Sequence, residues 1–175
     1  MEVFEAIQAR RSIRSYESKE IPEDILNRIL EAGRLSPSAM NLQPWHFIVV
    51  KDAAKRKALS AGRYAKFLSE SPVVIIGCAD KKRSEKWCVI DTTIALQSMV
   101  LTATAEGLGT CWVGSFDEGS VKSLLNIPDN FTVVALLALG YPKEKFDIAS
   151  KLIRARNRKP IDDIVGLDEF GKKRN

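Results

Sequence analysis

A long, mostly apolar stretch from Glu85 to Glu106 is the feature that most constrains how this chain can fold. Its spacing predicts one helix, which ends at Gly107 because glycine readily adopts the left-handed conformation of a helix cap. Apolar residues lie on almost every side of this helix: Ile94, Ala95, Leu96, Met99, Val100, Leu101, Ala103 and Ala105. A helix of this kind is buried, either within the fold or against a second copy of the chain.

Polar residues in this stretch argue against a membrane span, because Asp91, Gln97 and Glu106 would lie in lipid. We expect Asp91 and Gln97 to satisfy polar surroundings in the core or at a subunit seam, and not to act in catalysis. The N-terminal residues carry acids before their first basic pair and no apolar run, so no signal peptide is predicted. The expectation is a soluble, cytoplasmic protein.

Short helices and strands follow one another along the rest of the chain. A short helix is expected over Val3 to Ala9, and a second has Pro22 in its first turn and stops before Pro37. Strands are predicted at 45–50, 72–78, 110–114 and 132–139, with short helices at 118–125 and within 53–68, interrupted near Gly62. Few regular strand–helix–strand units occur, which favours an α+β fold or a three-layer sandwich. No repeat or linker divides the 175 residues, so one domain is expected.

The cysteine and histidine content excludes several kinds of chemistry. Cys78, Cys88 and Cys111 lie in apolar stretches and lack the C-x-x-C spacing of zinc sites, so we expect three reduced, buried thiols and no metal site. His46 is the only histidine, and a hydrolytic triad would depend on it alone. Because His46 follows Trp45 at the start of a strand, a structural role is expected for it.

Positive charge is concentrated at the two ends of the chain. The net charge is +5, and residues 151–175 alone carry +4. A tail cluster from Lys151 to Lys159 contains no acid, and Arg10, Arg11 and Arg14 form a second cluster. Three interpretations stay open: solvated faces, a nucleic-acid contact, or a site for one phosphorylated ligand. Few aromatic residues accompany the cations, which favours a discrete phosphate over single-stranded nucleic acid.

Two segments have the residue types of a ligand site. Arg10–Arg14, with the sequence RRSIR, supplies guanidinium groups and a hydroxyl that suit a monophosphate. The loop Pro37–Phe47 is stiffened by two prolines and offers hydrogen-bond partners for a heterocycle at Ser38, Asn41 and Gln43. Taken alone, this loop is also an ordinary connection between a helix and a strand. Neither a Rossmann glycine fingerprint nor a P-loop sequence is present.

With two further segments, these motifs resemble the nitroreductase family of flavin mononucleotide (FMN) enzymes. The family's R-R-S-x-R and P-S-x-x-N-x-Q-P-W-x-F motifs match Arg10–Arg14 and Pro37–Phe47. Its G-L-G-T-C-W-x-G strand matches Gly107–Gly114, and its basic pair before a proline matches Arg156–Pro160. The resemblance implies a single FMN-binding domain over residues 1–175, with a central, mainly antiparallel sheet flanked by helices. It also implies an intertwined homodimer with exchanged C-terminal segments.

The resemblance implies roles for particular residues in holding the flavin. Contacts to the phosphate and ribityl chain are implied for Arg10, Ser12, Arg156 and Arg158, and Arg11 matches another flavin-contacting position. Arg14 matches a basic residue near the pyrimidine edge, where a cation would stabilise the anionic reduced ring.

Two further segments complete the implied site. Pro37, Ser38 and Asn41 match positions that reach the flavin from the second subunit, and the segment of Val113, Gly114 and Ser115 matches the backbone that approaches flavin N5. Larger relatives have a Glu-Gly pair before Phe-Asp at this strand end, whereas this chain has Gly-Ser before Phe116-Asp117. The flavin contacts that larger relatives make around this chain's residues 65–75 are not matched.

Three functional hypotheses follow. In the first, an FMN-dependent enzyme passes electrons from NAD(P)H to a nitroaromatic, a quinone or a similar small molecule by a ping-pong mechanism, with no nucleic-acid or membrane partner. In the second, a specialised enzyme of the same fold destroys flavin or dehalogenates its substrate. In the third, a non-enzymatic protein binds nucleic acid through its basic tail. Flavin chemistry needs no protein nucleophile or metal, which agrees with the scarcity of histidine and cysteine.

Overall fold

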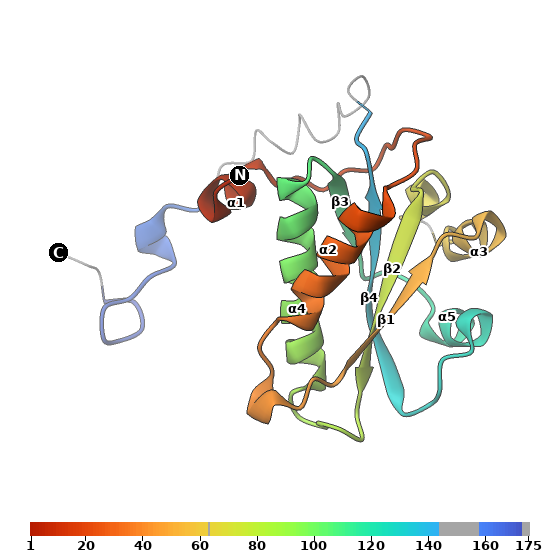
Figure 1. The fold of residues 1–175 in the computed structure, drawn as a ribbon. Helices are drawn as coiled ribbons and strands as arrows, with labels where there is room; N and C mark the ends of the chain where they lie inside the picture. Colours follow the sequence, from red (N-terminus) through yellow and green to blue (C-terminus); the bar gives the residue numbers. More distant parts are fainter. Residues whose placement is uncertain (63, 144–157, 173–175) are drawn as a thin grey trace.

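A four-stranded antiparallel sheet forms the centre of the fold (Figure 1). The computed structural model describes residues 1–62, 64–143 and 158–172. In the order β1-β2-β4-β3, the strands are β1 (Trp45–Val50), β2 (Val73–Asp80), β4 (Phe131–Gly140) and β3 (Gly109–Val113). All neighbouring strands are antiparallel. The predicted α+β class and antiparallel sheet are confirmed, and each of the predicted strands is present.

Helices cover both faces of the sheet and make three layers (Figure 1). One face carries α2 (Glu23–Arg34) and α4 (Cys88–Ala105), and the other carries α3 (Ala53–Leu59) and α5 (Glu118–Leu125). Beside α4 lies α1 (Val3–Ala9). Short 3-10 helices occur at η1 (Ala39–Asn41), η2 (Lys66–Ser69) and η3 (Ile161–Asp163).

The central strand β2 is buried on both of its faces. Val74 and Ile76 pack with the cluster under α3 and α5, whereas Val73 and Ile75 pack with the cluster under α2 and α4. Successive side chains of a strand point to opposite faces, so a continuous apolar run suits a strand between two helical layers. The prediction of a strand that is apolar on both faces is confirmed.

Small residues let α4 lie close to its neighbours. A Cβ on Gly77 of β2 would lie 2.5 Å from Leu96 Cδ1, and a Cβ on Gly33 of α2 would lie 2.1 Å from Met99 Cε. A side chain at either position would force Leu96 or the end of the Met99 side chain to move. The close packing of α4 against the sheet and α2 therefore depends on these two glycines.

The C-terminal end of α4 has the predicted glycine cap. Gly107 has a φ of +78°, and its N–H donates to the Thr104 carbonyl at 3.1 Å. The next N–H, that of Leu108, donates to the Ala103 carbonyl at 2.8 Å. These two bonds form a Schellman motif, which satisfies carbonyls at the end of the helix.

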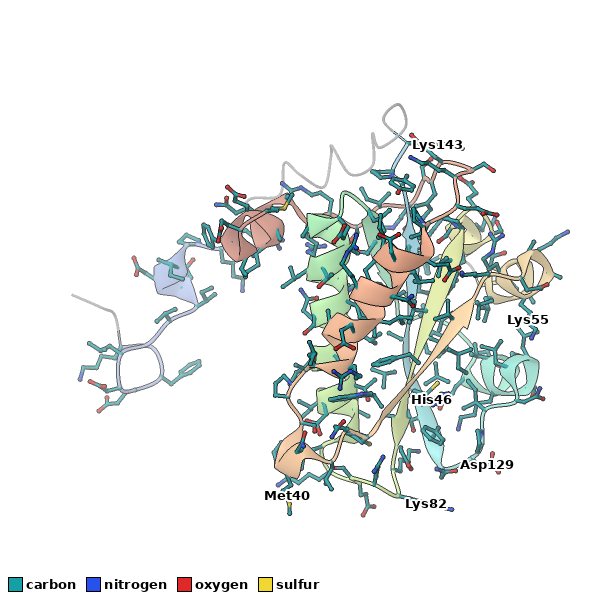
Figure 2. The ribbon with its side chains drawn as sticks, viewed as in Figure 1. Met40, His46, Lys55, Lys82, Asp129 and Lys143 are labelled. Carbon is teal, nitrogen blue, oxygen red and sulfur yellow. The ribbon has the colours of Figure 1, made fainter. Side chains whose placement is uncertain are left out.

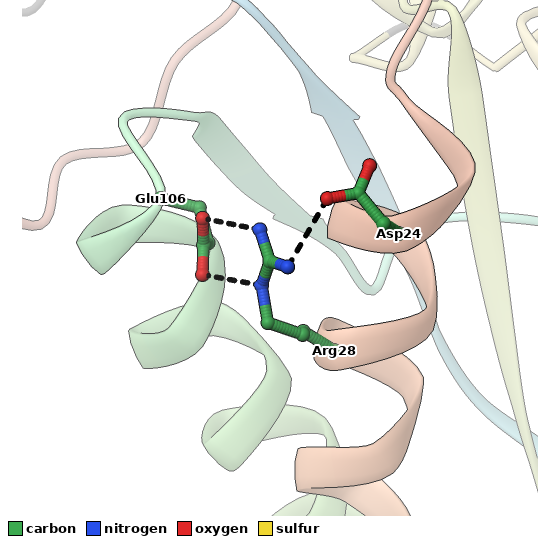
Figure 3. Close-up of polar contacts among 3 residues, drawn as sticks. All are labelled: Asp24, Arg28 and Glu106. Atoms are coloured by element: carbon green, nitrogen blue, oxygen red, sulfur yellow. Dashed lines mark hydrogen bonds and ion pairs between the residues drawn. The ribbon is translucent and has the colours of Figure 1, made fainter.

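An arginine fork joins α2 to the same end of α4 (Figure 3). Arg28 Nε and Nη2 donate to the two carboxylate oxygens of Glu106 at 2.9 and 3.1 Å, and Arg28 Nη1 donates to Asp24 at 3.1 Å. The hydrogen bond to Glu106 is the main cause that raises the pKa of Arg28. Paired donors of this kind fix the orientation of the two helices as well as their distance.

Within one chain, α4 is buried on one side only, so the expected burial of its other side against a second copy stays a prediction. The helix begins at Cys88 and not at Glu85, and one stripe of its side chains is exposed: Val89, Ile90, Thr93, Ile94 and Gln97. Only the opposite side packs on α2 and the sheet, which is why Asp91 is buried but Gln97 is not. By length and composition alone α4 could cross a membrane, but its packed side forms part of the core.

Further apolar side chains are exposed outside the sheet layers. On α1 these are Val3, Phe4 and Ile7, and the segment 158–172 exposes Ile161, Ile164, Leu167 and Phe170. Figure 1 shows this segment beyond α1, away from the sheet. Large apolar side chains exposed together on one short element are typical of an interface with another molecule.

Candidate functional site

The Arg10–Arg14 segment lies beside the start of β3, so the first and third sequence motifs meet. Ser12 and Thr110 form a parallel β-bridge, and the Ile13 N–H donates to the Thr110 carbonyl at 2.8 Å. Gly109 permits this approach, because a Cβ there would lie only 2.8 Å from the Ile13 Cβ. A glycine at the start of β3 therefore places Ser12 and its neighbours against the sheet.

Tyr16 anchors the far end of this segment. It is buried, and its hydroxyl donates to the Ile13 carbonyl at 2.6 Å. Burial, followed by the neighbouring Cys111, raises the pKa of Tyr16, while the positive charge of Arg14 opposes the shift. The phenol is therefore protonated at neutral pH and remains a hydrogen-bond donor.

The arginines of the segment have different surroundings. Nη1 of Arg11 donates to the carbonyls of Gln8 and Arg10, so this guanidinium satisfies the C-terminal end of α1. Arg14 is exposed, with Nη1 3.4 Å from the Ser12 carbonyl, and Arg10 is half-buried. The exposed Arg14 guanidinium presents most of its donors to the surroundings, where an anionic group could accept them.

The other end of β3 is open. Pairing with β4 ends at Val113, which is buried, and the exposed Gly114 and Ser115 continue beyond it. A Cβ on Gly114 would meet nothing within 4 Å, whereas a Cβ on Gly62 would lie 3.4 Å from the Ser115 carbonyl oxygen. The turn after α3 thus borders the open end of β3. The strand separates this end from Thr110 by about 13 Å at the usual rise per residue.

The predicted loop Pro37–Gln43 lies elsewhere, at the N-terminal end of α4. Its Ala39 N–H donates to the buried Asp91 carboxylate at 3.2 Å. Within the loop, Ser38 Oγ accepts the Gln43 N–H at 2.9 Å, and the Gln43 amide donates to the Asn41 carbonyl and side chain at 3.2 and 3.3 Å. Hydrogen bonds within and below the loop therefore define its shape.

The two predicted halves of the site are at opposite ends of the molecule. Met40 of the loop lies at one end and Lys143 at the other (Figure 2), and the Lys143 N–H donates to the Ser15 carbonyl beside the Arg10–Arg14 segment. The 18-residue helix α4 between them is about 27 Å long. One chain therefore cannot bring the loop and the Arg10–Arg14 segment to the same small ligand.

Several predicted residues lie away from both halves or outside the described part of the chain. Arg156 lies outside the described residues, and Arg158 is exposed at the start of the segment beyond α1. His46 is exposed on β1, with its ring centroid 6.1 Å from that of Phe131 at the start of β4. All three cysteines are buried thiols, as expected. Within residues 1–62, 64–143 and 158–172, no group of acidic, histidine and cysteine side chains is arranged to hold a metal.

Two cavities adjoin these segments. One of about 730 Å³ is bordered by Tyr16, the 17–21 loop, Lys51, Arg56 and Lys143. Acidic and basic side chains mix in its walls, so it has no clear charge preference. A second cavity of about 400 Å³ lies between α3 and α5 and includes Gly62.

Three residues of these arrangements were missed by the sequence analysis. Gly109 was not distinguished from the rest of its motif, Gly62 was recognised only as a helix break, and Asp91 was assigned to general polar surroundings. Each acts through a partner far away in sequence, namely Ile13, Ser115 and Ala39. The only local signals were the glycines themselves and an acid within an apolar helix.

Comparison with known proteins identifies the family. The model of the Nitroreductase family matches residues 7–62 and 59–141. A protein of Methanothermobacter thermautotrophicus, whose name pairs NADH dehydrogenase with NAD(P)H nitroreductase, is 38% identical over 152 residues, covering 82% of this chain and 79% of its own.

Solved structures of nitroreductases have the same fold as this chain. A nitroreductase family protein from Clostridium novyi NT has a TM-score of 0.79 and 32% identity, covering 99% of this chain and 97% of its own. An FMN-dependent nitroreductase from Clostridium difficile R20291 has a TM-score of 0.75 and 31% identity, covering 80% and 87%. On its matched motifs, its fold and this similarity over most of its length, the chain belongs to the nitroreductase family.

Proposed function

We propose that this protein is an FMN-dependent oxidoreductase that passes electrons from NAD(P)H to a nitroaromatic, a quinone or a similar small acceptor. One observation carries the proposal: the Arg10–Arg14 segment is fixed at one end of β3 while Gly114 and Ser115 lie open at the other. This arrangement offers phosphate-binding side chains and exposed backbone along one strand. The names of relatives, an FMN-dependent nitroreductase and an NAD(P)H nitroreductase among them, support the cofactor and the reductant.

The residues present fit an FMN phosphate. The Ser12 hydroxyl and the Arg10 guanidinium are the types of donor that bind phosphate oxygens. Arg158 lies away from them within one chain, so it and Arg156 would add charge only when the C-terminal segment is exchanged in the dimer. Arg11, which satisfies the end of α1, would contribute positive charge nearby.

The open end of β3 fits the flavin ring. Because Gly114 has no side chain and nothing lies within 4 Å of its Cβ position, a flat ring can approach the backbone of Val113, Gly114 and Ser115. Arg14 would lie by the pyrimidine edge and favour the reduced, anionic ring. FMN, when bound, supplies the hydride and electron-transfer chemistry, so the protein needs only to bind and orient.

The active enzyme is a homodimer in this proposal, and each flavin contacts both chains. Pro37, Ser38 and Asn41 reach the flavin of the partner subunit, which resolves the separation of the two halves within one chain. The exposed apolar side chains of α4 lie between these halves and those of α1 lie beside the Arg10–Arg14 half, and both sets would be covered in the dimer. The exchanged C-terminal segment would bury its exposed apolar residues on the partner.

A flavin bound in this way leaves one ring face for both substrates. NAD(P)H therefore leaves before the acceptor binds, which gives ping-pong kinetics and parallel double-reciprocal lines. The proposal treats residues 1–175 as one FMN-binding domain acting in the cytoplasm.

Titration with FMN and riboflavin tests the phosphate site. Arg10→Ala and Ser12→Ala should each weaken FMN binding about tenfold, because a hydrogen bond to a charged group contributes roughly 1.5–3 kcal/mol. Riboflavin lacks the phosphate, so its affinity should not change. Arg34→Ala is the matched control, since Arg34 is exposed on α2 and pairs with the nearby Glu31 of the same helix at 2.6 Å.

Other outcomes would favour the other hypotheses. Equal losses for both flavins would contradict the phosphate assignment. A colourless protein that binds oligonucleotides through its basic residues would favour a nucleic-acid-binding protein. Irreversible loss of the flavin spectrum during turnover, without reduction of an added quinone, would favour a flavin-destroying enzyme. Sedimentation as a stable monomer would contradict the shared site.

A further inference from the structure

The loop Pro37–Gln43 holds a backbone shape that its residues rarely adopt. Met40, Asn41 and Gln43 have φ values of +52°, +55° and +49°. In this left-handed region a Cβ is unfavourable, so the surroundings must impose the shape. Met40 is 91% exposed and lies at the end of the fold (Figure 2), so burial of its own side chain does not hold it there.

A buried carboxylate holds the loop where the left-handed run begins. Asp91 lies in the first turn of α4 and is only 4% exposed. Its Oδ2 accepts the N–H of Ala39, the residue before Met40, at 3.2 Å. A backbone N–H donating to a carboxylate makes a charge-assisted hydrogen bond, which is stronger than one between neutral groups. The negative charge is also favoured at the N-terminal end of a helix.

Two more contacts complete the clamp on the loop. The hydroxyl oxygens of Ser36 and Ser98 are 2.8 Å apart, and Ser98 lies about two turns after Asp91 on the same helix. Ser38 Oγ then ties the loop to itself by accepting the Gln43 N–H. Of these contacts, the one to Asp91 lies between Ser38 and Asn41, the two polar residues assigned to the partner's flavin.

We propose that Asp91 is a positioning residue for the flavin site of the partner subunit. Its carboxylate fixes Ala39 and thereby sets the positions of Ser38 and Asn41. Asp91 itself is buried beneath the loop and acts only through it. This inference rests on the proposed function, because it requires that the loop of one chain reach the flavin held by the other.

Paired flavin titrations separate this role from phosphate binding. Asp91→Ala should lower the affinities for FMN and for riboflavin by the same factor, roughly tenfold, because the lost hydrogen bond orders contacts to the ring and not to the phosphate. Asp91→Asn keeps a carbonyl acceptor for the Ala39 N–H and should restore most of the affinity. Thr92→Val is the matched control: Thr92 is the next residue, is fully buried, and its hydroxyl has no hydrogen-bond partner in the described part of the chain.

A variant on the loop side removes the same hydrogen bond if Asp91→Ala does not fold. Ala39→Pro deletes the N–H donor and leaves the buried helix unchanged. Ser38 is extended, with φ −142° and ψ 155°, which is the conformation that a residue before proline prefers. Ala39→Pro should therefore lower the affinities for both flavins as Asp91→Ala does.

Mixed dimers test whether the effect crosses the interface. One chain carries Asp91→Ala, and the other carries both Arg10→Ala and Ser12→Ala, so each homodimer has two weakened sites. In the mixed dimer, one site contains both the altered phosphate-binding residues and the loop weakened by Asp91→Ala. The other site contains intact phosphate-binding residues from one chain and an intact loop from its partner. We expect mixing to restore one high-affinity flavin site per dimer.

The possible failures are distinguishable. If Asp91→Ala and Ala39→Pro bind both flavins as the wild type does, the positioning role is wrong and the proposed function stands. If mixed dimers regain no site, the loop does not act on the partner and the inference is overturned. If the wild-type protein binds no FMN, the proposed function itself fails.

Discussion

Replacing Gly109 with alanine should detach the Arg10–Arg14 segment from β3. The new Cβ would lie 2.6 Å from Ile13 Cγ1, 2.8 Å from its Cβ and 3.0 Å from its Cγ2. Because carbon atoms in favourable contact are about 3.5–4.0 Å apart, Ile13 would have to move by about 1 Å. That movement would stretch the 2.8 Å hydrogen bond from the Ile13 N–H to the Thr110 carbonyl beyond its ordinary length.

The expected cost is that of overpacking, about 1–3 kcal/mol in the free energy of unfolding. In a chain of this size each kcal/mol lowers Tm by roughly 2–4 °C. Since the displaced segment carries Arg10 and Ser12, FMN affinity should also fall about tenfold, with a much smaller change for riboflavin.

Thermal unfolding followed by circular dichroism, together with flavin titrations, measures both effects. Gly119→Ala is the control: its Cβ would come no closer than 3.7 Å to Asp117, and alanine favours the helix α5. Adding Ile13→Ala to Gly109→Ala removes two of the three close atoms and should recover part of the loss. If Gly109→Ala alone changes neither Tm nor FMN affinity, the glycine does not position the phosphate-binding segment.

Three other perturbations have defined outcomes. Arg14→Ala should lower the reduction potential of bound FMN by roughly 30 mV, equivalent to about 1.4 kcal/mol, in a spectroscopic redox titration; an unchanged potential would remove Arg14 from the ring edge. Arg28→Ala should lower Tm more than Arg34→Ala, because Arg28 joins α2 to α4, and the difference should shrink in high salt; equal effects at low salt would contradict the fork's role. Burial raises the pKa of Cys78 to about 11, so the thiol ionises at lower pH in the unfolded chain than in the folded one. Its contribution to the free energy of unfolding is therefore fully present below pH 9 and is lost as the pH rises through 11. Urea unfolding of Cys78→Ala should lose part of this alkaline dependence.

Local signals in the sequence were sufficient for most of the helices and strands. Pro22 precedes α2, the Gly107 cap ends α4 as predicted, and the strand Trp45–Val50 has the predicted bounds. The antiparallel sheet followed from the family resemblance and not from these signals. Which strands pair could not be derived from them, because β1, β2 and β4 are joined through residues far apart in the chain.

Side-chain partners were harder to predict than elements. With apolar residues on almost every side of α4, the sequence did not indicate which stripe faces the core. Asp91 and Gln97 were therefore not distinguished, although Asp91 is buried and Gln97 is exposed within one chain. Asp91 meets the Ala39 N–H across 52 positions of sequence, a contact that only the folded chain defines. The flavin roles of Arg10, Arg14 and the other matched residues stay predictions, since their basis is the resemblance.

In the proposed dimer, the distance between the two ends of α4 would make cofactor binding and subunit association linked equilibria. A flavin that contacts the Arg10–Arg14 segment of one chain and the Pro37–Gln43 loop of the other binds the dimer more tightly than the monomer. Association of the subunits raises the flavin affinity of each site by some factor. By linkage, saturating flavin must lower the dimer dissociation constant by that same factor for each site. Dilution should therefore release cofactor, and cofactor concentration should set the protein concentration at which the subunits separate.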